Sequence, residues 1–113
     1  MDPARIDRIR LLKGPQFSED AAAALTQGEF SVPAGNRMGI QLEGPAVPGG
    51  QVVSEGNPAG AIQVTPGGRP IILMSDRGTI GGYAKPAIVH PDDLSRMAQF
   101  RQGQVVRFAE MQK

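Results

Sequence analysis

The chain has 113 residues, no cysteine, a single histidine and a formal net charge of +1. This length supports one domain spanning residues 1–113, and the composition excludes a disulfide framework, a thiolate zinc site and a poly-histidine metal centre. The basic residues are dispersed, no apolar run approaches the roughly 20 residues of a membrane span, and the N-terminus lacks the apolar segment of a secretory signal. We therefore expect a cytoplasmic protein that binds neither nucleic acid nor membrane.

In chain order, the first expected element is a short strand at residues 7–12. Its apolar positions fit neither the strand nor the helix period perfectly, but Ile9 and Leu11 alternate with polar residues and Gly14-Pro15 ends the run. Ser18 then precedes two acidic residues and four alanines. A serine N-cap followed by acids in the first turn is typical of a helix start. The pattern predicts a helix over residues 19–26, which Gly28 ends.

The rest of the chain consists of short apolar runs separated by turn residues, with 15 glycines and 10 prolines in all. Frequent turns leave little room for long helices. Pro91 and the acids after it predict the start of a second short helix. The pattern favours a mainly β fold, a small β-barrel with two short helices, over a βαβ array. The further expected elements are strands at residues 29–32, 38–42, 51–54, 61–64, 70–74, 83–89 and 104–108, and the second helix at 91–98.

Three segments resemble the motifs of one known family. Residues 36–44, NRMGIQLEG, resemble its DRMGyRLeG; residues 54–64, SEGNPAGAIQV, are similar to its SEGvppGaIQVP; residues 75–85, SDRGTIGGYAK, are similar to its aDRqTtGGYpK. The family is the allophanate hydrolase subunit 2, or biotin-dependent carboxyltransferase (Kip antagonist-like), group, which includes the C-subunit of bacterial 5-oxoprolinase. The resemblance is to its C-terminal half. It implies a cyclophilin-like barrel and little activity for this chain alone.

Asp76 and Lys85 are the two residues that we expect to be catalytic. Asp76 and Arg77 follow Ser75 at the end of the apolar run at residues 70–74. At a strand exit, an aspartate can accept a substrate N–H and an arginine offers a planar donor fork. Lys85 lies two residues after Tyr83 and shares its strand face, where a cation can polarise a carbonyl. A structural ion pair or turn, and a solvated lysine, are the alternatives. The resemblance implies that Asp76 and Lys85 are catalytic.

Other candidates would bind the substrate. Gly81-Gly82 allow a close approach of the backbone to a ligand, or else form a strand bend. Glu55 is expected in a loop, and Gln63 faces opposite to its strand neighbours, toward a pocket or toward solvent. Arg37 follows an asparagine where the family has aspartate. The predicted substrate-binding residues are Arg37, Glu55, Gln63, Arg77, Gly81, Gly82 and Tyr83, and no metal site is predicted.

The resemblance implies a subunit or fragment of a biotin-dependent carboxyltransferase or 5-oxoprolinase-type complex that acts on a small amide of the urea, allophanate or 5-oxoproline class. The sequence has no phosphate-binding G-x-x-x-x-G-K-[ST] motif and no biotinyl-lysine context, so ATP or biotin would come from partner subunits. The expected partner is a Kip-inhibitor-like protein, similar to the B-subunit of 5-oxoprolinase, or a second copy of the chain. The alternative is a non-catalytic regulatory module that pairs with such a protein.

Overall fold

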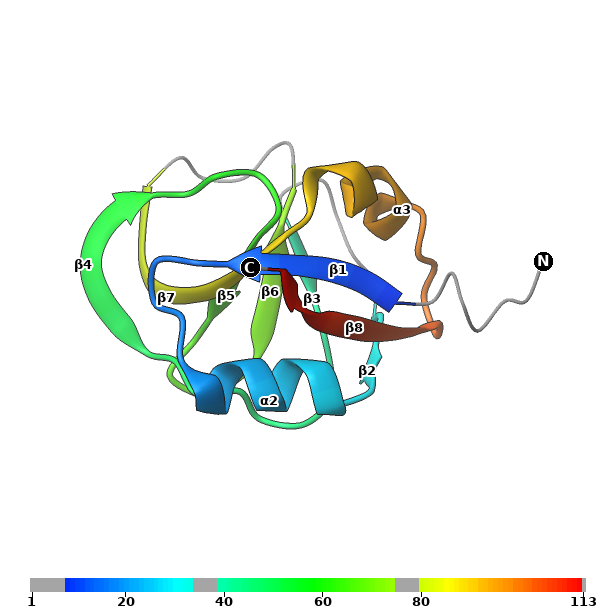
Figure 1. Ribbon diagram of the computed structural model, residues 1–113, viewed down its shortest axis with the longest axis horizontal. Helices are drawn as coiled ribbons and strands as arrows, with labels where there is room; N and C mark the ends of the chain where they lie inside the picture. The colour runs from blue at the N-terminus through cyan, green and yellow to red at the C-terminus, as the bar shows by residue number, and fades with distance from the viewer. Residues whose placement is uncertain (1–7, 34–38, 75–79, 113) are drawn as a thin grey trace.

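The structure is a computed structural model that describes residues 8–33, 39–74 and 80–112 (Figure 1). It is mainly β, and every described element lies where the residue pattern predicts one. No helix in these ranges is long and apolar enough to cross a membrane. The strands are β1 (Arg8–Lys13), β2 (Phe30–Ser31), β3 (Gly39–Gln41), β4 (Gln51–Gly56), β5 (Ala61–Val64), β6 (Pro70–Leu73), β7 (Ile80–Val89) and β8 (Val105–Gln112), and the helices are α2 (Glu19–Gln27), the 3-10 turn η1 (Pro91–Asp93) and α3 (Leu94–Ala98).

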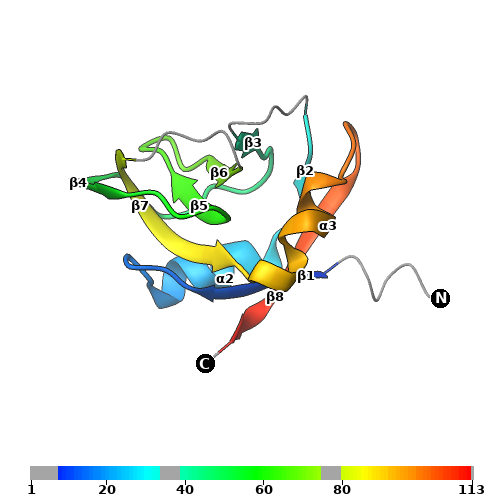
Figure 2. The ribbon, with the colours of Figure 1, turned by 90° about the horizontal axis from the view of Figure 1, so that it is seen from above.

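The strands form one curled sheet in the order β2-β8-β1-β7-β5-β6-β3. Only β1 and β8 pair in parallel among these neighbours. The two end strands approach each other at a bridge, where Ser31 N donates to Glu43 O at 2.7 Å and Glu43 N donates to Ser31 O at 3.0 Å. Figure 2 shows the resulting curl, with β3, β5 and β6 on one side and β1 and β8 on the other. The barrel prediction is therefore confirmed.

Strand β7 is the longest, and it pairs with three other strands. Its residues after Tyr83 pair with β5 and β1, while its first residues pair with β4 through Glu55↔Gly81 and Gly56↔Ile80. The strand thus begins before the predicted start at Tyr83. The residue pattern did not predict this extension because it contains Gly81 and Gly82, and glycine is depleted in strands. In the fold, the partner strand β4 supplies the pairing, and the β4–β7 ribbon projects from the barrel in Figure 1.

Helix α2 starts where its cap predicts. Ser18 Oγ accepts a hydrogen bond from Ala21 N at 3.1 Å, which satisfies one of the free N–H groups of the first turn. Ala21 and Leu25 form the buried face of the helix, which packs against β8. Burial of a leucine-sized side chain stabilises by about 2 kcal/mol. The largest buried apolar side chains are Ile9, Leu11, Leu25, Phe30, Leu42, Ile62, Ile72, Met97 and Phe108.

A buried carboxylate fastens the η1–α3 segment to β1. The Asp93 side chain is only 2% exposed, and it accepts hydrogen bonds from Arg10 N (2.8 Å), Nε (3.0 Å) and Nη2 (3.0 Å). Arg96 Nη1 donates to Asp93 Oδ1, the oxygen that also accepts from Arg10 Nη2, at 3.3 Å. The Arg10 side-chain hydrogen bond is the largest contribution that lowers the pKa of Asp93 from 3.8 to about 2. The interaction joins residues 83 positions apart.

We expect Asp93→Asn to lower the free energy of unfolding at pH 7 by about 2 kcal/mol, since each pKa unit corresponds to about 1.4 kcal/mol. The pKa is lower in the folded state, so this stabilisation is present above about pH 4 and is lost as the pH falls toward 2. Urea denaturation at several pH values measures the difference. Asp92→Asn, at an exposed neighbouring carboxylate, is the control. A constant difference between Asp93→Asn and the parent down to pH 2 would contradict the assignment.

Candidate functional site

Lys85 lies in the middle of β7, and its side chain is completely buried, at 0% exposure. Its Nζ lies 3.1 Å from Glu55 Oε1 and donates to the carbonyl oxygen of Tyr83 at 3.4 Å. A buried ammonium is tolerated only where a counter-charge and hydrogen bonds replace water. The pairing of β4 with β7 therefore brings together two residues that the sequence predicts for the site, Lys85 and Glu55.

Glu55 lies on strand β4, and the prediction that it lies in a loop is wrong. The strand continues to Gly56 because its last residues pair with the start of β7. The Glu55 side chain is 37% exposed, so one side of the ion pair faces solvent. The neighbouring Gln16 amide and, after it, the Lys85 ammonium lower the pKa of Glu55. Oε1 has no well-aligned hydrogen bond among the described residues, so its contact with Nζ is mainly electrostatic.

Gln16 belongs to this site although the sequence analysis did not single it out. Its backbone N donates to Lys85 O at 3.2 Å, and its side-chain Oε1 accepts from Lys85 N at 2.8 Å. The loop reaches β7 because Gly14 has no side chain: a Cβ there would lie 2.1 Å from Lys85 O. The only available signal was the Gly-Pro-Gln sequence after the first strand, which local patterns explain equally well as a turn.

Two amide side chains pack against Gly81. A Cβ at Gly81 would lie 2.7 Å from Asn57 Nδ2 and 3.1 Å from Gln63 Oε1. The close approach predicted for the glycine pair thus exists at Gly81, and its neighbours are side chains of the protein itself. Gln63, for which the sequence left pocket or solvent open, is half-buried and directed at the start of β7. Asn57 is buried and was not predicted.

The remaining predicted residues divide into two groups. Gly82 faces β4, where a Cβ would lie 3.3 Å from Val52 O. Tyr83 is half-buried, and its carbonyl is the group that accepts from Lys85. The residues Arg37, Asp76 and Arg77 lie outside the described residues and stay predictions. Within the described ranges, no three His, Cys, Asp or Glu side chains are close enough to hold a metal ion.

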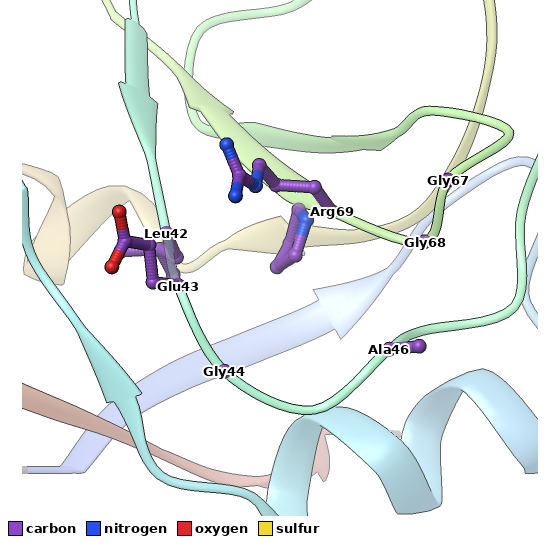
Figure 3. Close-up of a pocket in the computed structure, with 8 residues that line it drawn as sticks. Leu42, Glu43, Gly44, Ala46, Gly67, Gly68 and Arg69 are labelled. Carbon is purple, nitrogen blue, oxygen red and sulfur yellow. The ribbon is translucent and has the colours of Figure 1, made fainter.

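A pocket of about 340 Å³ opens elsewhere, between the chain after β3 and the turn before β6 (Figure 3). The charged side chains of Glu43 and Arg69 belong to its lining, together with several glycines. Glu43 and Arg69 are both exposed. None of the predicted site residues lines this pocket, so it is separate from the Lys85–Glu55 pair. Its lining residues are Leu42, Glu43, Gly44, Ala46, Gly67, Gly68, Arg69 and Pro70.

The sequence is similar to a known family along almost all of its length. A family model described as "Carboxyltransferase domain, subdomain A and B" matches residues 1–110. The C-subunit of 5-oxoprolinase from Escherichia coli K12 is 34% identical over 111 residues, which cover 92% of this chain and 36% of that protein. The protein of the same name from Haemophilus influenzae is 41% identical over 76 residues, covering 65% of this chain and 25% of that protein. The chain therefore spans about a third or less of these relatives.

Solved structures contain the same fold. The crystal structure of TTHA0988 matches with a TM-score of 0.88 and 50% identity over 91% of this chain and 21% of that one. The K. lactis urea amidolyase and the Kluyveromyces lactis urea carboxylase each match with a TM-score of 0.83 over 93% of this chain, which is 7% and 11% of those chains. Their identity of 22% shows the fold alone.

A double-mutant cycle tests the buried pair. We expect Glu55→Gln to lower the melting temperature, because it leaves the buried ammonium of Lys85 without this carboxylate. Lys85→Met, similar in shape and uncharged, should be tolerated better, and the double variant should be more stable than Glu55→Gln alone. Thermal denaturation of the four proteins measures the coupling. Strictly additive effects would show that the two charges do not interact.

Proposed function

This chain belongs to the carboxyltransferase domain family, subdomains A and B, and from that premise we propose that it is part of a biotin-dependent carboxyltransferase or 5-oxoprolinase-type complex acting on a small amide. The observation that carries the proposal is the buried Lys85–Glu55 pair. Both residues lie in segments whose motifs resemble the family, at residues 54–64 and 75–85. A buried lysine held by a partly exposed carboxylate is an arrangement typical of functional sites.

The proposed chemistry uses the complementarity between this pair and an amide. The Lys85 ammonium would donate to the carbonyl oxygen and stabilise negative charge that develops there. The amide N–H would be accepted by a carboxylate. We assign this role to Asp76, together with Glu55, which lies beside Lys85. A substrate reaching the ammonium would approach from the exposed side of Glu55. Urea, allophanate and 5-oxoproline all offer the required carbonyl and N–H groups.

The cofactors belong to the partners in this proposal. The ureido ring of biotin presents the same N–H and C=O groups as the substrates, so Lys85 and Glu55 suit it chemically. When bound, carboxybiotin supplies the carboxyl group to be transferred, and this chain's residues orient the acceptor amide and exclude water. ATP would be handled elsewhere, since the sequence lacks the phosphate-binding motif noted above.

Turnover of the assembled complex tests the function. We expect Lys85→Met and Glu55→Gln to reduce ATP-dependent 5-oxoproline cleavage, or carboxyl transfer to urea, by about a hundredfold or more, as loss of a polarising or acid–base group does. Lys13→Met removes an exposed lysine from the neighbouring β1 and is the matched control. Circular dichroism verifies the fold of each variant. Full activity of folded Lys85→Met would exclude the lysine from catalysis.

A partner subunit would dock on strand β4. This strand pairs only with β7 in the described structure, contains no buried side chain and carries Val53 at 89% exposure. Two-stranded ribbons are marginal in water, and an exposed apolar residue on a free strand edge favours association. We propose a Kip-inhibitor-like protein as the occupant.

Val53→Asp should weaken binding of the Kip-inhibitor-like protein by about tenfold or more, the loss expected for a central apolar contact. Val105→Asp changes another exposed valine, on β8, and should have a smaller effect on binding. Calorimetry or size-exclusion chromatography with light scattering gives the affinity. Unchanged affinity of Val53→Asp would exclude β4 as the interface. Binding that persists while turnover is absent in every combination of subunits would favour the regulatory alternative.

A further inference from the structure

Gln16 holds the main chain of the strand that contributes Lys85 to the ion pair. Its backbone N donates to Lys85 O at 3.2 Å, and its side-chain Oε1 accepts from Lys85 N at 2.8 Å. The Gln16 amide also lowers the pKa of the Glu55 carboxylate. Since the amide oxygen already accepts from Lys85 N–H and a carboxylate is an acceptor only, the NH₂ group is the end of the amide that can act on Glu55. One residue of the β1–α2 loop therefore fixes the main chain of β7 beside the ion pair.

The ladder between β1 and β7 explains why a side chain takes this place. Regular pairing ends at Lys13↔Ala87, and Gly14 N then donates to Pro86 O at 2.9 Å. Pro15 has no N–H to continue the ladder. The backbone N–H of Gln16 and its side-chain oxygen together satisfy both polar groups of the Lys85 main chain. Without them, the N–H of a buried residue would lack a partner, which is costly.

We propose that Gln16 is a positioning residue for the site: its backbone N–H and its amide oxygen hold the main chain of Lys85, which leaves its amide NH₂ to act on the Glu55 carboxylate. A role of Gln16 in catalysis rests on the proposed function of the Lys85–Glu55 pair. Glutamine suits both contacts because it offers an acceptor and a donor at the end of one side chain. Gln16 and, after it, Lys85 lower the pKa of Glu55, so the titration of Glu55 reports on the second role.

Two substitutions separate the two contacts. Gln16→Ala removes both, whereas Gln16→Glu keeps an acceptor for Lys85 N–H, loses the donor to Glu55 and adds a like charge. We expect hydrogen exchange of the Lys85 amide to accelerate about tenfold or more in Gln16→Ala and to change little in Gln16→Glu, since a lost hydrogen bond weakens local protection by about that factor. The pKa of Glu55 should rise in both variants. Gln102→Ala, at an exposed glutamine, is the control.

NMR on the isotope-labelled chain gives the amide exchange and the Glu55 carboxyl titration, and turnover of the assembled complex gives the functional consequence. Unchanged Lys85 exchange in Gln16→Ala, or an unchanged Glu55 titration in both variants, overturns the positioning role. Changed exchange and titration with reduced turnover in both variants support it. Changed exchange and titration with normal turnover overturn the proposed function of the Lys85–Glu55 pair, while the contacts of Gln16 stand. The two proposals therefore fail in distinguishable ways.

Discussion

Strand β7 imposes the constraint on which the other features depend, because it shares its ten residues among three partner strands. Its first part pairs with β4, and the remainder pairs with β5 and β1. Because β7 pairs with three strands, the side chain of Lys85 lies inside the protein, at 0% exposure. Since an ammonium is unfavourable there without a counter-charge, the fold requires a carboxylate next to it. Strand β4 provides that carboxylate through Glu55.

Two ionic centres among the described residues differ in how completely they are enclosed. Asp93 is 2% exposed and accepts from three nitrogen atoms of Arg10 and one of Arg96, which leaves little capacity for a ligand. Such a closed centre fastens α3 to the barrel. Glu55 is 37% exposed and lies beside a buried ammonium, so its centre is open on one side. An open centre with strong local electrostatics suits the recognition of a polar amide, because a preorganised charge needs no reorientation when the ligand arrives.

Three amide side chains lie against strand β7, the strand that carries Lys85. Gln16 holds the main chain of Lys85, while Asn57 and Gln63 lie against Gly81, where only a glycine leaves them room. Neutral amides can act as donor or acceptor without adding charge. Gln16 therefore holds the backbone of β7, and the three amides add no charge beside Lys85 and Glu55. Gly14 has the matching role on the loop side, since any Cβ there would collide with Lys85 O.

The sequence by itself determined the fold class, the approximate place of every described strand and helix, and the family. Local signals suffice for these features: the alternation of Ile9 and Leu11 in β1, the Ser18 cap of α2, and motif segments that match in order. It also identified Lys85, Glu55 and Gln63 as candidate site residues. The tertiary structure alone decided that Glu55 lies on a strand, that Gln16 joins the site from 69 positions away, and that Asp93 is an anchor. The physical reason is that strand pairing and ion pairing between distant segments depend on the closed sheet, and neither leaves a trace in the local periodicity of the chain.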